Sequence, residues 1–165
     1  MSDEGQGEGQ GEGQAAQQGG EQEFHVQKVY LKDASFETPG SPGIFTSEWN
    51  PSINVELNTR GERIGDDVVE VVVTVTVTAK IEETTAYLCE VQQAGIFTVS
   101  GIEGENLNAL LGSYCPQILF PYAREAVSDL VAKGGFPQML LAPMNFDALY
   151  AQQRAQAQQQ QGGTH

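Results

Sequence analysis

Residues 68–99, VVEVVVTVTVTAKIEETTAYLCEVQQAGIFTV, decide the fold of this 165-residue chain. In the first half, apolar side chains recur at every odd position from Val69 to Ala79, with Glu70 and three threonines between them. The second half separates Tyr87, Cys89, Val91 and Gln93 from Leu88, Glu90 and Gln92. This period of two predicts two antiparallel β-strands with the valine row buried. Because apolar residues also occur on the opposite face, we expect further structure to cover that face as well.

The two strands fix each other's register. If the valine row shares a face with Cys89 and Val91, each pair of opposed positions sums to an even number, which predicts a turn of odd length near residues 82–84. A slip by one residue would bury Glu90 instead. Gly95 interrupts the second strand, and we expect a bulge there.

Two further strands are expected before this hairpin. In residues 24–37, FHVQKVYLKDASFE, strict alternation gives two faces. One face carries Phe24, Val26, Tyr30, Ala34 and Phe36, and the other carries His25, Gln27, Val29, Leu31, Asp33, Ser35 and Glu37. Residues 38–52 are rich in proline and glycine and predict a long crossing loop. A short alternating strand at Ile53, Val55 and Leu57 should then end at a turn in residues 58–67, NTRGERIGDD.

After Gly104 the periodicity becomes helical. Residues 105–114 and 118–135 predict one long helix, disturbed by Pro116 and open to a kink at Pro121. Residues 136–144, FPQMLLAPM, are apolar and extended, and Asn145 caps a last helix. The fold class is therefore α+β, a four-stranded antiparallel sheet with one long helix and one C-terminal helix.

Composition divides the chain into a domain and two tails. Residues 1–23 consist almost entirely of glycine, glutamine and glutamate and are expected to be disordered. Residues 24–150 form the single domain. Residues 151–165 are expected to be a helix end followed by a flexible, glutamine-rich tail.

The charge of the chain limits its partners. The formal net charge is -14, and six acids precede Phe24 without a single base. Such a surface repels phosphate and anionic lipid, so neither nucleic acid nor a membrane is an expected partner. No apolar run approaches the roughly 20 residues of a membrane-spanning helix, and no signal peptide is apparent, so we expect a cytoplasmic protein. The unpaired Cys89 and Cys115 suit that reducing compartment.

No catalytic, metal or cofactor site is expected. The chain has only two histidines, His25 and His165. The close carboxylate pairs lie at predicted turns or strand ends, with no base or nucleophile near them in sequence. They are Asp66 with Asp67, Glu82 with Glu83, and Glu103 with Glu105. The GEGQGEGQ repeat follows no strand, so it is not a nucleotide-binding loop. We therefore predict a protein that is not an enzyme and needs no cofactor.

Six segments follow one another along the chain: YLKDASFETP, the Trp49-Asn-Pro loop, LCEVQQAGIF, SYCPQILFPYARE, GGFPQMLLAP and NFDALY. In this order they resemble the SecB family of bacterial protein-export chaperones. The resemblance covers about residues 24–150. It implies a homotetramer built as a dimer of dimers. It also implies that the protein holds unfolded precursor polypeptides without ATP and delivers them to the translocation ATPase SecA.

The candidate site residues fall into three groups. The crossing loop, the apolar 136–144 segment and the last helix together predict a groove for unfolded clients. Its lining candidates are Phe45, Trp49, Ile53, Val55, Leu57, Met139, Leu140, Phe146, Leu149 and Tyr150. The resemblance further implies that Cys89, Val91 and Gln93 face a subunit interface, and that Asp33, Glu37, Leu88 and Glu90 lie on the exposed face toward SecA.

Two alternatives remain open at this point. One is a SecB-like chaperone that serves a toxin and antitoxin pair, and the other is a small-ligand enzyme built in the groove. The chain ends RAQAQQQQGGTH, without acids. The family's C-terminal tail, which contacts the zinc-bearing tail of SecA, differs in composition, so the resemblance does not support that contact here. Any zinc would belong to the partner.

Overall fold

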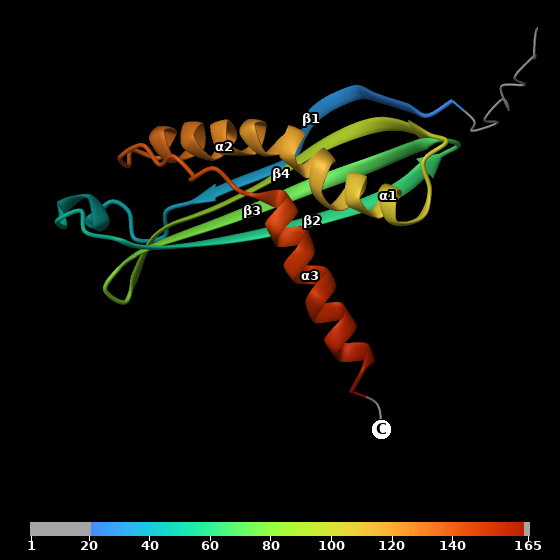
Figure 1. Ribbon diagram of the computed structural model, residues 1–165. Helices are drawn as coiled ribbons and strands as arrows, with labels where there is room; N and C mark the ends of the chain where they lie inside the picture. Colours follow the sequence, from blue (N-terminus) through green and yellow to red (C-terminus); the bar gives the residue numbers. More distant parts are fainter. Residues whose placement is uncertain (1–20, 164–165) are drawn as a thin grey trace, which may run out of the picture.

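The computed structural model describes residues 21–163 and contains one sheet and a set of helices (Figure 1). The predicted tail, residues 1–23, lies outside the described residues as far as position 20. The strands are β1 (Glu23–Glu37), β2 (Ser52–Gly65), β3 (Val68–Ile81) and β4 (Thr84–Ser100), joined antiparallel in the order β1-β4-β3-β2. The crossing loop holds a short 3-10 helix, Gly43–Thr46. The remaining elements are α1 (Gly104–Ala109), a π-helical turn (Leu110–Tyr114), α2 (Cys115–Lys133) and α3 (Phe146–Gln161). The predicted α+β architecture is confirmed.

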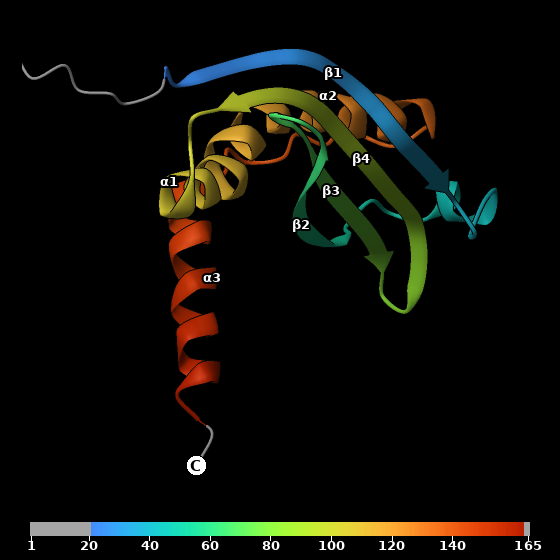
Figure 2. The same ribbon diagram turned by 90° about the vertical axis from the view of Figure 1, so that its right-hand side faces the viewer.

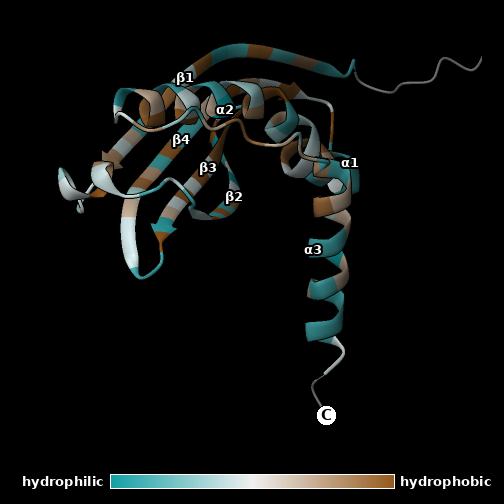
Figure 3. Ribbon diagram, turned by 90° about the vertical axis from the view of Figure 1, so that its left-hand side faces the viewer, coloured by the Kyte–Doolittle hydropathy of each residue, from teal (hydrophilic) through white to brown (hydrophobic). Residues whose placement is uncertain are grey.

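Helix α2 covers one face of the sheet, chiefly over β4 and β3 (Figure 1). The odd-numbered side chains of both strands face it, and Val75 lies opposite Val91 while Val77 lies opposite Cys89. Leu119, Ala123 and Val127 of α2 are fully buried against this row. The predicted alternation is therefore confirmed, and apolar and polar residues alternate along the strands (Figure 3).

The β3–β4 hairpin reaches this register by a different route from the expected one. Its turn is the two-residue Glu82–Glu83, with Glu82 at φ 55°, so the odd-length prediction is wrong. A register shift after Ala79 leaves Ala86 as the extra residue, and that shift returns the valine row to the same face as Cys89. Gly95 is not a bulge between β3 and β4 either, since β4 continues through it opposite Val71. A Cβ there would lie 2.7 Å from Phe97 Cε2 and 2.9 Å from Leu119 Cδ2, so glycine lets the Phe97 ring and α2 pack closely at this position.

Strand β2 is longer than its sequence suggests. The prediction that it ends near Asn58 is wrong, because residues 58–65 continue to pair with β3. The turn lies at Asp66 and Asp67, with Asp67 at φ 56°. β2 is an edge strand, so its polar residues remain in water and the hydrophobic pattern that would reveal a strand is absent.

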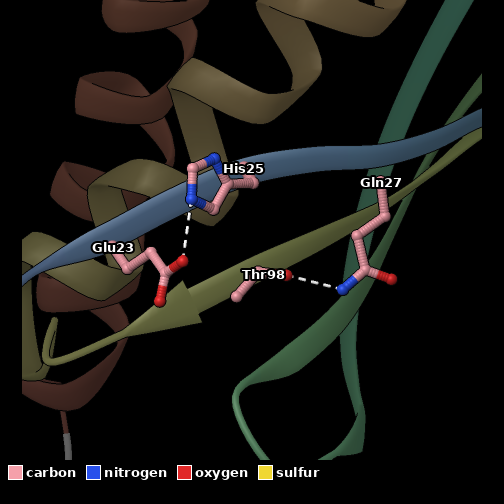
Figure 4. A network of polar contacts seen from close by, with 4 residues as sticks. All are labelled: Glu23, His25, Gln27 and Thr98. Atoms are coloured by element: carbon pink, nitrogen blue, oxygen red, sulfur yellow. Dashed lines mark hydrogen bonds and ion pairs between the residues drawn. The ribbon is translucent and has the colours of Figure 1, made fainter.

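Strand β1 contains two bulges, at Gln27 and Lys32. Pairing with β4 therefore places six residues on the helix side, and they are Phe24, Val26, Val29, Leu31, Ala34 and Phe36. The predicted faces are wrong at Val29, Tyr30 and Leu31, since strict alternation counts no bulge. Near the first bulge, Gln27 Nε2 donates to Thr98 Oγ1 and His25 contacts Glu23 (Figure 4). The strand curves over the sheet edge (Figure 2).

The helical region from Gly104 to Lys133 is continuous but irregular. Pro116 has no N–H to donate to the carbonyl of Gly112, and the π-helical turn Leu110–Tyr114 lies immediately before it. The predicted disturbance at Pro116 is thus confirmed, and α2 continues through Pro121. None of the helices in residues 21–163 is long and apolar enough to cross a membrane.

The two thiols provide a test of this packing. Burial raises the pKa of Cys89 to about 11 and that of Cys115 to about 12, from an ordinary value of 9.0. Neither thiol should be alkylated at pH 8 in the native protein, whereas a Ser35→Cys variant, exposed on β1, should react at once. Mass spectrometry after a brief iodoacetamide pulse measures this difference.

The same pKa shifts predict the direction of a pH effect on stability. Because the folded-state pKa values are raised, both thiols favour the fold fully below about pH 9, and this contribution is lost as pH rises toward 11–12. The urea midpoint should therefore fall over that range.

Rapid alkylation of native Cys89 or Cys115 at pH 8 would contradict the buried placement.

Candidate functional site: an uncovered apolar groove

Three apolar side chains of β2 lie on the helix side of the sheet, at the edge of the area that α2 covers. Ile53, Val55 and Leu57 pair with Ala79, Val77 and Val75, so they continue the buried rows of β3. Helix α2 packs on β4 and β3 and does not extend over this edge strand. Ile53 and Val55 consequently remain 42% and 44% exposed.

Two adjoining hollows follow this row. The first, of about 140 Å³, is lined only by apolar residues, which are Val55, Leu57, Val75, Phe120, Leu141, Ala142 and Met144. The second, of about 230 Å³, lies between β2 and α3, and its lining is Leu57, Thr59, Gly112, Met144, Phe146, Leu149, Tyr150 and Gln153. Since Leu57 and Met144 border both, the hollows adjoin each other, and we call the two together the groove.

Helix α3 forms one wall of the groove and is held by the π-helical turn. The Asn145 side chain accepts a hydrogen bond from Ala148 N at 3.0 Å and caps the helix as predicted. The buried Ser113 hydroxyl donates to the Asp147 carboxylate. The Tyr150 ring lies over Gly112, where a Cβ would be 2.5 Å from Tyr150 Cδ2. The distortion before Pro116 therefore provides both residues that position α3.

Beyond Arg154, α3 leaves the rest of the protein. Every residue from Ala151 to Gln161 is exposed, and the helix projects away from the sheet (Figure 1). Arg154 makes a 2.6 Å ion pair with Glu105 at the start of this projection. Only the first turns of α3 therefore contribute to the groove.

An aromatic cluster adjoins the start of β2. Trp49 stacks on Tyr87 with ring centroids 6.3 Å apart and lies 5.4 Å from Phe136, which also contacts Phe45 at 5.1 Å. Tyr87 OH donates to Met139 Sδ at 3.5 Å. Phe45 is 50% exposed. Because Tyr87 lies opposite Ala79, which lies opposite Ile53, the cluster and the β2 row share one face of the sheet.

The predicted groove residues thus divide between two neighbouring places. Val55, Leu57, Phe146, Leu149 and Tyr150 line the groove. Phe45, Trp49 and Met139 belong to the aromatic cluster, and Ile53 lies on the row between them.

Leu140 does not belong with the others. It is 62% exposed and borders a separate cavity of about 500 Å³ beside α2, with Pro121 and Arg124. Its neighbour Leu141 is buried and lines the groove instead. Met139 and Leu141 turn inward while Gln138 and Leu140 turn outward, but this alternation does not continue to the buried Phe136, so nothing in the sequence pattern favours Leu141 over Leu140. Sequence reasoning also missed Met144, Phe120 and Phe136.

The four residues expected on the SecA-facing side form one cluster on the uncovered outer face of the sheet. Glu37 lies opposite Leu88, Ser35 opposite Glu90, and Asp33 opposite Gln92. Leu88 is 37% exposed, and Thr76 Oγ1 donates to Glu90 Oε2 at 3.2 Å. We call Asp33, Glu37, Leu88 and Glu90 the outer acidic patch.

Cys89, Val91 and Gln93, expected at a subunit interface, are buried within this single chain. Their side chains are 1%, 0% and 4% exposed beneath the chain's own helices, so they cannot contact another subunit directly. Gln93 Nε2 donates to the Tyr30 carbonyl at 3.0 Å. A role of Cys89, Val91 and Gln93 at a subunit interface stays a prediction. These residues could affect an interface only by changing the position of α2, which packs on them.

The described part of the chain offers no centre for metal chemistry. Within residues 21–163, no three or more His, Cys, Asp and Glu side chains gather in a way that could hold a metal ion.

Comparison with known proteins decides the family. Over residues 17–157 the chain matches the family described as preprotein translocase subunit SecB. The chain belongs to the SecB family. Protein-export protein SecB of Alcanivorax borkumensis is 62% identical over 141 residues, covering 84% of this chain and 90% of the relative. The Methylococcus capsulatus protein of that name is 59% identical over 140 residues (85% and 90% covered). The one from Nitrosococcus oceani is 58% identical over 144 residues (86% and 88% covered).

A solved structure confirms the SecB fold. A SecB-like chaperone of Mycobacterium tuberculosis, in complex with a peptide from an antitoxin, superposes with a TM-score of 0.62. It covers 73% of this chain and 90% of its own, at 16% sequence identity. At that identity the likeness concerns the fold alone.

Proposed function

We propose that this SecB family member holds unfolded precursor polypeptides in the cytoplasm without ATP and delivers them to SecA. Its role in protein export follows from its family and from relatives of that name at 58–62% identity. The observation that carries the holding step is the groove, in which the apolar β2 row meets the first turns of α3 and remains partly exposed. The toxin and antitoxin alternative is not favoured, since the SecB-like chaperone with an antitoxin peptide is 16% identical to this chain, whereas the export proteins are 58–62% identical.

The groove suits an extended apolar segment. Along an extended chain successive side chains alternate, so every second residue of a client would enter a hollow while the others remain in water. Each large apolar side chain that is fully buried contributes about 1.5–3 kcal/mol, part of which offsets the entropy lost on association. Binding and release then follow from equilibrium and leave no step that requires a nucleotide.

Client choice can depend on rates. At about 1 µM chaperone and an association constant of roughly 10⁶ to 10⁸ M⁻¹s⁻¹, capture proceeds at about 1 to 100 per second. Slowly folding precursors are captured and fast folders escape. The net charge of -14 favours clients that contain lysine and arginine.

Assembly as a homotetramer, a dimer of dimers, supports tight holding. Strand β1 is one edge of the sheet, and its helix-side residues Val26 and Leu31 are 45% and 51% exposed. An edge strand with apolar side chains favours pairing with another chain. Four copies of the groove on one particle raise the effective concentration for a long client.

Docking to SecA is the proposed role of the outer acidic patch. Asp33, Glu37 and Glu90 surround the half-exposed Leu88, so a basic partner surface with an apolar centre would fit it. The patch and the groove lie on opposite faces of the sheet, and a client and SecA can bind at the same time.

The rival enzyme gains no support from the groove. Among the residues that line its two hollows there is no carboxylate, imidazole or thiol, so they offer no acid and base pair. The proposal therefore rests on apolar contact alone.

Client holding is tested by Leu57→Glu, which places a charge in the centre of the groove. Affinity for a reduced, unfolded precursor should fall about ten-fold, because the carboxylate loses water when a client covers it. The measurement is the delay of precursor refolding, with light scattering to follow the complex. Asn58→Glu introduces the same charge at the neighbouring position, on the outer face of the sheet. It should change the affinity for the precursor less than two-fold, roughly the effect of a surface charge. Equal loss in both variants would show that the groove is not the binding site.

SecA docking is tested by Glu90→Lys. Reversing this charge should weaken SecA binding about ten-fold while client holding changes less than two-fold, as expected for a charge at the rim of a separate surface. Glu62→Lys makes the same reversal at the other end of the outer face and serves as the matched control. A parallel loss of SecA binding and client holding in Glu90→Lys would indicate a folding defect and contradict separate faces.

A further inference from the structure

The bulge at Lys32 decides which way the end of β1 faces. Leu31 lies opposite Gln93 and Asp33 lies opposite Gln92, so Lys32 is the extra residue. Upstream, Lys28 and Tyr30 lie on the outer face. Uninterrupted alternation from Tyr30 would give Phe36 to the outer face and turn Asp33 and Glu37 toward α2. Two of the three acids of the outer acidic patch therefore depend on this one extra residue.

Glu70, two strands away on β3, contacts the residues on both sides of Leu31. Its Oε1 accepts from Lys32 Nζ at 2.7 Å, and its other carboxylate oxygen accepts from the Tyr30 hydroxyl. The carboxylate spans β4 to reach them, because Glu70 lies opposite Ile96 of β4, and Ile96 lies opposite Lys28 of β1. The side chain of Glu70 is only 13% exposed, so solvent screens this pair less than an ordinary surface pair.

The same bulge is held from the helix side by Gln93, through its hydrogen bond to the Tyr30 carbonyl. Within one chain β1 is an edge strand and pairs with β4 alone. A bulge interrupts the backbone hydrogen bonds between neighbouring strands. Side-chain hydrogen bonds on the two faces of the sheet therefore contribute more to the conformation of β1 here than they would in a central strand.

We propose that Glu70 is a positioning residue for the outer acidic patch. The hydrogen bonds that it accepts from Tyr30 and Lys32 hold the bulge in place, and the bulge turns Asp33 and Glu37 outward. This inference rests on the proposed docking of SecA at that patch and adds a residue that does not touch the partner. The hydrogen bond from Lys32 and then that from Tyr30 hold the pKa of Glu70 below its ordinary value. The carboxylate thus stays charged at neutral pH, and its hydrogen bonds with Lys32 and Tyr30 persist there.

The test replaces Glu70 by threonine, the residue type found at Thr74, Thr76 and Thr78 along the same row. Threonine favours a strand more than glutamate does, and it lacks the carboxylate that contacts Tyr30 and Lys32. In the assembled, full-length protein, Glu70→Thr should weaken SecA binding about five-fold through loss of the coupled contacts, and hydrogen exchange at residues 31–35 should become faster. Client holding should change less than two-fold, within the scatter of independent sites.

Glu62→Thr is the matched control. Glu62 lies directly opposite Glu70 on β2, so it removes the same charge from the same region of the outer face. It should leave SecA binding and hydrogen exchange unchanged. If Glu62→Thr and Glu70→Thr weaken SecA binding equally, net charge explains the effect and the inference is overturned.

A charge exchange separates positioning from general stability. Glu70→Lys alone places two cations together and should weaken SecA binding more than Glu70→Thr does. Adding Lys32→Glu restores an ion pair of opposite direction and should recover most of the binding and the slow exchange at residues 31–35. Absence of recovery, or loss of client holding along with SecA binding, would overturn the inference.

The hydrogen-exchange measurement is independent of the proposed function. If the unmodified protein does not bind SecA, the docking proposal fails. Hydrogen exchange at residues 31–35 still tests whether Glu70 holds the bulge in place. If exchange there is the same with and without the Glu70 carboxylate, the positioning role is overturned whatever the binding result.

Discussion

The packing of α2 on the odd-numbered residues of β3 and β4 is the constraint on which the other features depend. One helix is too narrow for a four-stranded sheet, and it covers the two central strands. The apolar row of β2 faces the same way but lies outside the helix, so it stays exposed and becomes one side of the groove. Within residues 21–163 the helices lie on one face of the sheet (Figure 1), so the outer acidic patch on the other face stays exposed to water. Both proposed binding surfaces thus arise from the same shortage of covering helix.

The sheet also keeps the two surfaces apart. Neighbouring residues on a strand point to opposite faces, so Cys89 is part of the core while Leu88 and Glu90 lie in the outer acidic patch. The groove depends in turn on irregular backbone, since the π-helical turn before Pro116 supplies Gly112 and Ser113, which seat Tyr150 and Asp147 of α3. Regular strands separate the surfaces, and local irregularities shape them.

The sequence predicts the regular parts of the fold well and the irregular parts poorly. The period of two in residues 68–99 was sufficient for the hairpin and for the face that its two strands bury, because burial on one face requires that pattern, but the length of the turn was predicted wrongly. The bulges at Gln27, Lys32 and Ala86 were not predicted. An extra residue moves the following side chains to the opposite face of the sheet without changing the composition of the strand. Lys28 and Lys32 were the available signal, since strict alternation places both on the apolar side of β1. Five of the candidate client-binding residues lie on β2 and α3 and line the groove, whereas Leu140 lies in the extended segment before α3 and borders a separate cavity.

The central claim is that unfolded clients bind the helix side of the β2 edge. It is tested most directly by a photo-crosslinking amino acid placed at Val55 in one variant and at Asn54 in another. These neighbours lie on the same strand and on opposite faces of the sheet, and both are exposed. Irradiation in the presence of a reduced, unfolded precursor should give a strong crosslink from position 55 and little from position 54. Equal crosslinking from both positions, or a stronger crosslink from position 54, would contradict the claim.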